Sequence, residues 1–86
     1  MLTGAQIRMA RGYLNWSVAR LEEVSGVSAT TIKRMEKSDG IPKTMSDKLM
    51  DIRRALEGAG LEFTPENGHA AGVRPKAKPA PDADAD

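Results

Sequence analysis

The chain of 86 residues contains no cysteine, very few aromatic side chains and a single histidine. Without cysteine it can form neither disulfides nor thiolate metal sites, so we expect a small core held by helix packing and a reducing, cytoplasmic setting. No stretch approaches the roughly 20 apolar residues that a membrane-spanning helix needs. His69 is the only histidine, and the sequence offers no second metal ligand for it. The sequence also lacks a glycine-rich loop that could bind phosphate. We therefore expect no enzyme activity, cofactor, metal site, small-molecule ligand or membrane partner.

The formal net charge of +1 conceals an uneven distribution of charge. Residues 1–60 carry ten basic and seven acidic side chains, an excess of +3, which permits DNA as a partner without selecting it. From Arg74 onward, the sequence RPKAKPAPDADAD lacks any large apolar side chain. Burial of apolar surface therefore cannot offset the conformational entropy that this segment would lose on folding. We therefore predict a disordered tail over residues 75–86.

Thr3, Ser17 and Ser28 each carry a hydroxyl suited to cap the N-terminus of a helix. Each follows an apolar residue that can pack against another one within the helix, an arrangement called a hydrophobic staple. These signals and the apolar spacing predict helices over residues 4–14, 18–25 and 29–37, and a start at Thr44 predicts a fourth over 45–57. The side chains expected to be buried are Ile7, Ala10, Leu14, Trp16, Leu21, Val24, Ile32, Met35, Leu49, Ile52 and Leu56.

Gly26 ends the second predicted helix, and only two residues separate it from the third. Such a short connection forces the two helices to cross steeply. Gly58 and Gly60 break the fourth helix, and the alternating pattern that follows predicts short strands over residues 61–64 and 72–74. The sequence thus predicts a mainly α fold, with four helices in residues 1–60, a short β segment in 61–74 and the tail.

The segment from residue 17 to residue 36, SVARLEEVSGVSATTIKRME, resembles the helix-turn-helix of the Cro and phage-repressor family, the xenobiotic-response-element type of regulator. The matching positions are Leu21, Gly26, Val27, Ser28, Ile32, Met35 and Glu36, and a looser likeness extends over residues 2–56. The resemblance implies a four-helix lambda-repressor-like domain whose third helix enters the major groove of DNA. It also implies that Arg11 pairs with Glu36 and braces the first helix against the third.

Two positions depart from the pattern of this family. Val18 stands where the family often has a glutamine that contacts the DNA backbone, so that contact is expected to be missing. Glu22 stands where the family prefers alanine, near the crossing of the second and third helices, and burying an unpaired carboxylate there is costly. We expect Glu22 to turn toward solvent or toward a basic neighbour such as Arg8 or Arg20.

The outward face of the third predicted helix offers small residues first and long cations after them. Small side chains allow close approach to base edges, and Arg34 can donate two hydrogen bonds to guanine. Flanking lysines and hydroxyls suit phosphate oxygens, which position a protein without reading sequence. The expected base contacts are Ala29, Thr30, Thr31 and Arg34. The expected phosphate contacts are Ser17, Ser28, Lys33, Lys37, Ser38 and Lys43.

These observations predict a sequence-specific transcriptional regulator, a repressor rather than an activator, which binds a two-fold symmetric double-stranded DNA operator as a homodimer. Leu61 and Phe63, with the exposed part of the fourth helix, are the expected dimer surface, through strand pairing between subunits. The alternative is a protein-interaction module, antiactivator or antitoxin-like, that keeps the fold without binding DNA. The departures at Val18 and Glu22 are the features that favour this alternative.

Overall fold

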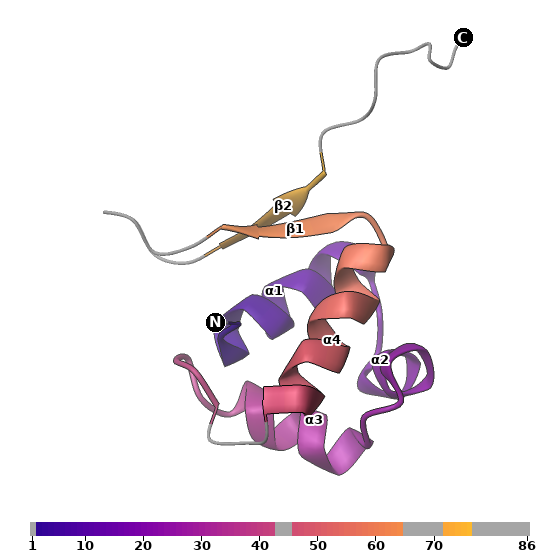
Figure 1. Cartoon of the computed structure of the whole chain (residues 1–86), viewed down its shortest axis with the longest axis vertical. Helices are drawn as coiled ribbons and strands as arrows, with labels where there is room; N and C mark the ends of the chain where they lie inside the picture. The colour runs from indigo at the N-terminus through magenta and orange to yellow at the C-terminus, as the bar shows by residue number, and fades with distance from the viewer. Residues whose placement is uncertain (1, 43–45, 65–71, 77–86) are drawn as a thin grey trace, which may run out of the picture.

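The computed structural model describes residues 2–42, 46–64 and 72–76 of the chain. Within them lie four helices and an antiparallel pair of strands, so the expected mainly helical fold with a short β segment is confirmed (Figure 1). The elements are α1 (Gly4–Leu14), α2 (Val18–Ser25), α3 (Ala29–Glu36), α4 (Ser46–Gly58), β1 (Leu61–Thr64) and β2 (Gly72–Pro75). The expectations for Lys43, Thr44, Met45, His69 and residues 77–86 lie outside the described residues.

The three predicted helix starts are confirmed by their capping geometry. The hydroxyl oxygens of Thr3, Ser17 and Ser28 accept hydrogen bonds from the backbone N–H three residues later, at 3.1, 3.0 and 3.2 Å. Asn15 and Gly26 then end α1 and α2 in the left-handed conformation, with φ of 58° and 79°. None of the described helices combines the length and apolar character required to cross a membrane.

The core is formed where the four helices and the sheet meet, and nearly all of the expected apolar residues lie in it. The buried apolar side chains are Leu2, Ile7, Ala10, Leu21, Val27, Ile32, Met35, Leu49, Ile52, Leu56 and Leu61. The expectation for Val24 was wrong, because its side chain is 41% exposed. Val24 lies about 60° around α2 from Leu21, and only the centre of this short apolar stripe is covered by neighbouring elements.

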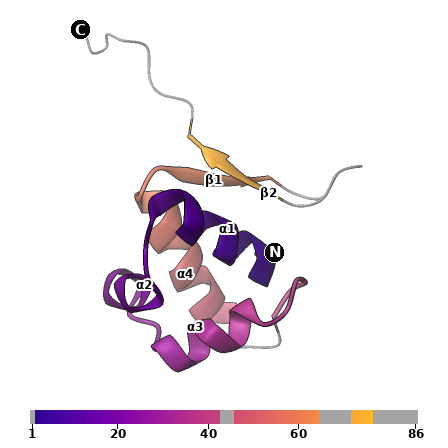
Figure 2. The same cartoon turned by 180° about the vertical axis from the view of Figure 1, so that it is seen from behind.

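Figures 1 and 2 show the two-stranded sheet at one end of the molecule and α3 at the opposite end. β1 packs against α4, whereas β2 packs against α1. Both α1 and α2 contact α3 as well. The sheet is therefore separated from α3 by the other helices.

The strands pair in the register Leu61 to Pro75 and Phe63 to Val73. Leu61 is buried in the core of its own chain, which corrects the expectation that its side chain faces a second subunit, whereas Phe63 is only half-buried against the core. The alternating pattern did mark one buried face, but α1 and α4 of the same chain cover that face. β2 extends one residue beyond its expected end, to Pro75.

Gly4, at the start of α1, lies in close contact with the end of α3 and the residues that follow it. Gly4 donates its backbone N–H to the carbonyl of Gly40 at 2.9 Å. A Cβ atom on Gly4 would lie 1.9 Å from the carbonyl oxygen of Ser38 and 2.3 Å from that of Met35, so only glycine fits. Because of this close approach, the first turn of α1 fixes the position of the C-terminal end of α3.

Gln6 is buried, and its side-chain amide is fully used. Its Oε1 accepts a hydrogen bond from the backbone N–H of Thr3 at 2.9 Å. Its Nε2 donates to the carbonyls of Thr64 at 3.2 Å and Gly72 at 2.8 Å, which are the ends of the two strands. This single side chain therefore anchors the sheet on α1, and both polar atoms of its own buried amide have hydrogen-bond partners.

Candidate nucleic-acid interface

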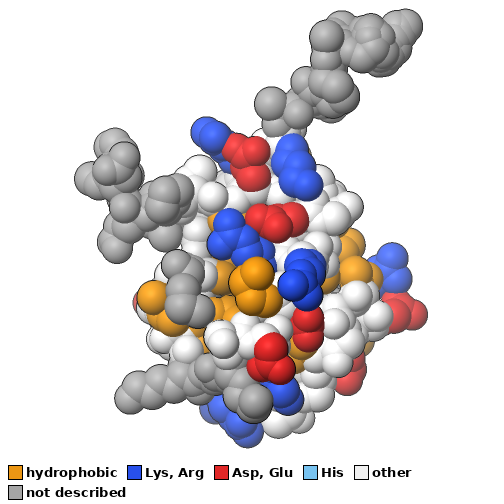
Figure 3. All heavy atoms as spheres, in the orientation of Figure 1, with side chains coloured by type: hydrophobic (Ala, Val, Ile, Leu, Met, Phe, Trp, Pro, Cys, Tyr) orange, Lys and Arg blue, Asp and Glu red, His pale blue; other side chains and the backbone are white. Residues whose placement is uncertain are grey.

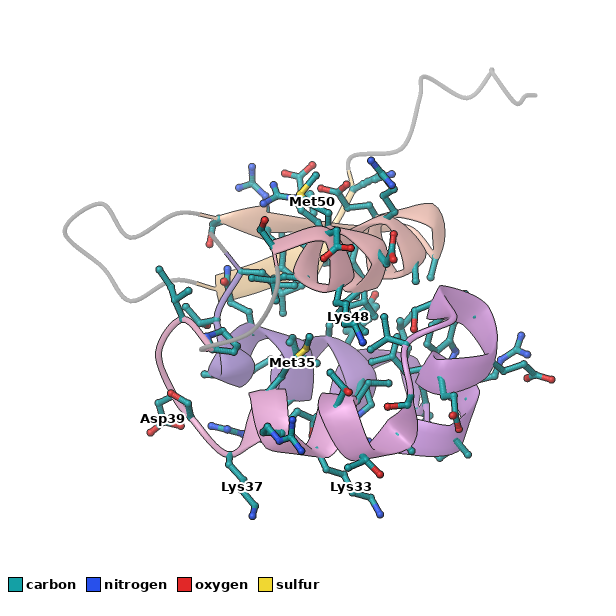
Figure 4. The ribbon with its side chains drawn as sticks, turned by 60° about the horizontal axis from the view of Figure 1, so that its bottom comes forward. Lys33, Met35, Lys37, Asp39, Lys48 and Met50 are labelled. Carbon is teal, nitrogen blue, oxygen red and sulfur yellow. The ribbon has the colours of Figure 1, made fainter. Side chains whose placement is uncertain are left out.

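One side of α3 presents a continuous polar stripe to solvent. Thr30, Lys33, Arg34 and Lys37 are all exposed and follow one another at the spacing of a single helix face. Together they line a shallow hollow of about 300 Å³. Figure 4 shows Lys33 and Lys37 pointing away from the rest of the protein, whereas Met35 points into the core. Helix α3 therefore contributes one face to the core and turns a cationic face outward.

Arg34 differs from the other arginines of the chain in having no carboxylate partner among the described residues. The six other arginines each pair with an acidic side chain, in the pairs Arg8–Asp39, Arg11–Glu36, Arg20–Glu23, Arg53–Glu57, Arg54–Asp51 and Arg74–Glu62. In the same part of the chain Lys33 and Lys37 also form no ion pair. The stripe on α3 thus keeps its positive charge available to an outside partner.

Arg11 neutralises the acidic residue nearest to this stripe. Its Nε and Nη2 donate to the two carboxylate oxygens of Glu36 at 2.7 and 2.8 Å, and its Nη1 donates to the carbonyl of Trp16 at 2.9 Å. The side chains of Arg11 and Glu36 are only 23% and 10% exposed. The ion pair implied by the family resemblance is therefore confirmed, and it joins α1, the start of α2 and the end of α3.

The hydrogen bond that Arg11 donates to Glu36 raises the pKa of Arg11. Burial opposes this rise in pKa, and the attraction between the two charges adds to it. A raised pKa keeps the guanidinium charged as the pH increases, so the pair persists throughout the alkaline range.

Arg8 engages a second acidic residue at the C-terminal end of α3. Its guanidinium donates to the carboxylate of Asp39 and to the backbone carbonyl of Glu36. A cation at this point also complements the negative end of the helix dipole. Arg8 and Arg11 of α1 thereby hold both acidic residues that lie closest to the cationic stripe.

Most of the hydroxyl side chains that the sequence predicts as DNA contacts also form hydrogen bonds within the protein. Ser28 accepts the capping bond of α3 and donates its own hydroxyl to Oγ1 of Thr31 at 3.0 Å, which leaves the Thr31 hydroxyl free to donate. Ser17 caps α2, and Ser38 accepts the N–H of Gly40 at 3.1 Å, so each of these two can still donate to a phosphate oxygen. Ala29 is half-buried at the start of the stripe.

The two departures from the family pattern disturb nothing in the packing of α2. Val18 is half-buried and packs against the core, so an apolar side chain suits its position. Glu22 is exposed, as expected. The basic neighbours suggested for it, Arg8 and Arg20, pair with other carboxylates instead. The crossing of α2 and α3 is thus free of a buried charge.

A second hollow, which the sequence did not predict, lies between α2 and the end of α4. Its volume is about 360 Å³, and its lining consists of Trp16, Arg20, Val24, Arg54, Ala55, Gly58 and Ala59. The guanidinium of Arg20 lies 5.6 Å from the centre of the Trp16 ring, which is half-buried. These residues come from separate segments, and no local pattern in the sequence links them.

No family model matches this chain, and searches of curated proteins and of solved structures found no match either. The function is therefore inferred from the geometry and charge of the protein itself.

Proposed function

We propose that this protein is a sequence-specific, double-stranded DNA-binding transcriptional regulator with a helix-turn-helix fold. The observation that carries the proposal is the stripe of Thr30, Lys33, Arg34 and Lys37 on a helix whose nearby acidic residues are held by α1. The major groove of B-form DNA is wide enough to admit an α-helix. Placed there, α3 would meet base edges with its outer face and phosphates with its flanks.

The residues of the stripe differ in the parts of DNA that they can contact. Arg34, the arginine without a partner among the described residues, can donate two hydrogen bonds to guanine, a contact that discriminates by about 1–3 kcal/mol. Thr30 lies one turn earlier on the same face and suits a base edge or a thymine methyl group, as do Ala29 and Thr31. Lys33 and Lys37 are point charges without fixed geometry and suit phosphates.

One recognition helix covers only a few base pairs, so useful occupancy of an operator calls for two of them. We propose a homodimer that places two α3 helices about 34 Å apart, one turn of DNA, on a two-fold symmetric operator. Occupancy of a promoter by such a dimer excludes polymerase by its bulk, which favours repression as the outcome.

The decisive experiment compares two arginine variants in DNA binding. Selection of bound sequences from a random duplex pool identifies the operator, and fluorescence anisotropy then measures affinity as salt rises. Arg34→Ala should strongly weaken binding to the operator and should affect binding to other sequences little, whereas Arg74→Ala, an exposed arginine on β2, should leave both affinities unchanged. The slope of log affinity against log salt should be about −0.9 for each phosphate neutralised.

A second outcome would favour the protein-interaction module instead. The exposed hollow with Trp16 and Val24 is the observation that supports this alternative. If no duplex in the pool binds even at low salt, DNA is not the partner and α3 serves another surface. Equal effects of Arg34→Ala and Arg74→Ala on operator binding would also reject the proposed role of α3.

A further inference from the structure

The two edges of the β1–β2 sheet differ in their capacity to accept another strand. The backbone N–H of Lys76 donates to the carbonyl of Gly60 at 2.8 Å, which identifies these two residues as a hydrogen-bonded pair. Along an antiparallel ladder, hydrogen-bonded pairs alternate with pairs that are not hydrogen-bonded. Phe63 and Val73 therefore form a pair without hydrogen bonds between them, and so do Leu61 and Pro75. The backbone polar groups of these residues point away from the partner strand. These groups line the free edges of the sheet.

Pro75 closes the edge of β2 to further pairing. A proline has no N–H, and its ring occupies the position where a neighbouring strand would receive a hydrogen bond. The edge of β1 carries no proline, and in the described part of the chain the outward backbone groups of Phe63 find no partner. β1 is therefore the edge that can accept a strand.

The surface below the edge of β1 is apolar at its centre and mixed in charge around it. Phe63 is half-buried, and the guanidinium of Arg53 lies 5.7 Å from the centre of its ring. Met50, three residues before Arg53 on α4, is 45% exposed and points away from the core (Figure 4). The face of the molecule in Figure 3 shows acidic and basic side chains next to one another around apolar ones.

We propose that a second copy of this chain docks on this surface, pairing β1 with β1 into a four-stranded antiparallel sheet and packing Met50 of the two copies together. The surface suits an identical partner, because it carries both signs of charge and most of its charged side chains are already paired within the chain, as Arg53–Glu57 and Arg54–Asp51. Two copies can therefore meet without strong repulsion between like charges. The charged side chains of this α4 face are Asp47, Asp51, Arg53, Arg54 and Glu57.

The symmetry of this pairing agrees with the proposed DNA binding, on which the inference rests for its biological role. Two identical strands that pair antiparallel at one edge are related by a two-fold axis perpendicular to the sheet. Because the sheet and α3 lie at opposite ends of the molecule, that axis turns both α3 helices toward the same side. One DNA duplex can then contact both of them.

Amide exchange tests the strand pairing at two opposed positions. In the proposed dimer the Phe63 amide exchanges slowly, and its protection grows with protein concentration. The Val73 amide, its cross-strand neighbour on the edge closed by Pro75, exchanges fast at every concentration. Protection of Val73 with an unprotected Phe63, or fast exchange of both in a dimer, would overturn the proposal.

A pair of matched variants tests the packing at Met50. Met50→Glu should raise the dissociation constant of the dimer by about tenfold or more, measured by analytical ultracentrifugation without DNA. Met9→Glu is the control, because Met9 is similarly exposed, at 43%, but lies on α1. Circular dichroism verifies that both variants fold. A native protein that stays monomeric at micromolar concentration, or equal effects of the two variants, would contradict the interface.

These outcomes are separable from failure of DNA binding. If the protein is a monomer but binds a single half-site duplex with affinity that depends on Arg34, the DNA-binding function stands and only the interface falls. If the dimer forms as proposed and no duplex binds, the reverse is true.

Discussion

Arg11 and Glu36 form a two-pronged ion pair between α1 and the last turn of α3, with nitrogen–oxygen distances of 2.7 and 2.8 Å. Both side chains are largely withdrawn from solvent. The pair therefore fixes the position of α3 and also removes a negative charge from the neighbourhood of its cationic stripe. The same contact thus has a structural and an electrostatic consequence for the proposed DNA interface.

Removal of Arg11 should destabilise the protein far more than removal of an exposed arginine. Arg11→Ala leaves the Glu36 carboxylate buried without a partner, which costs about 3–5 kcal/mol in the free energy of unfolding. Arg54→Ala breaks an exposed pair of 3.6 Å with Asp51 and should cost about 0–1 kcal/mol. Urea denaturation of the two variants measures the difference, and equal midpoints would show that the buried pair adds nothing.

The contribution of Arg11 should not depend on pH in the alkaline range. Its pKa is raised in the folded protein, so the stabilisation is present below the ordinary arginine pKa and is lost only as the pH rises through the still higher folded value. The stability difference between the native protein and Arg11→Ala should therefore be the same at about pH 7 and about pH 10. A difference that shrinks over this range would contradict the assignment.

Two glycines of α1 should respond to alanine in opposite directions. Gly4→Ala places a Cβ against two backbone carbonyls that cannot move independently, so we expect a loss of about 1–3 kcal/mol or more. Gly12→Ala meets no atom within 4 Å and removes the helix penalty of glycine, for a gain of about 0.4–1 kcal/mol. Thermal unfolding followed by circular dichroism reports both, and a neutral Gly4→Ala would disprove the tight contact.

Replacement of Gln6 should destabilise the sheet more than the helices. Gln6→Leu keeps an apolar stem but removes the donor to the Thr64 and Gly72 carbonyls, at a cost of about 1–3 kcal/mol. The amides of β1 and β2 should exchange faster, whereas those of α3 should change less. Exchange that accelerates uniformly over the chain would indicate global destabilisation and not a local anchor.

Lys37 should contribute equally to the affinity for all DNA sequences. Lys37→Ala removes the proposed phosphate contact, so affinity should fall by a similar factor for operator and random duplexes, and the salt slope should decrease by about one unit. Lys48→Ala, on α4, serves as the comparison. A change in base preference caused by Lys37→Ala would mean that this side chain reads bases.

The helix starts could be predicted from the sequence because capping is local. The hydroxyls of Thr3, Ser17 and Ser28 act within three residues of their own positions, and all three were found as expected. The pairing of Arg11 with Glu36 spans 25 residues and was expected only through the family resemblance.

Other features could not be predicted, because they depend on how separate elements meet. Alternation in β1 indicates that one face is covered but not by what, so Leu61 was misassigned to a subunit interface. Val24 has the spacing of a core residue and yet remains exposed, because it borders the open hollow between α2 and the end of α4. The contacts of Gln6 with Thr64 and Gly72, 58 and 66 residues away, leave no local sign in the sequence.

The clamp formed by Gln6 has a practical use in protein engineering. Because one side chain holds the carbonyls of Thr64 and Gly72, it adds to the strand pairing in keeping the two strand ends together. Lengthening such a connection carries only a small entropic cost. An epitope or fluorophore-binding peptide grafted between Thr64 and Gly72 should leave the fold intact and sit at the end of the protein remote from α3.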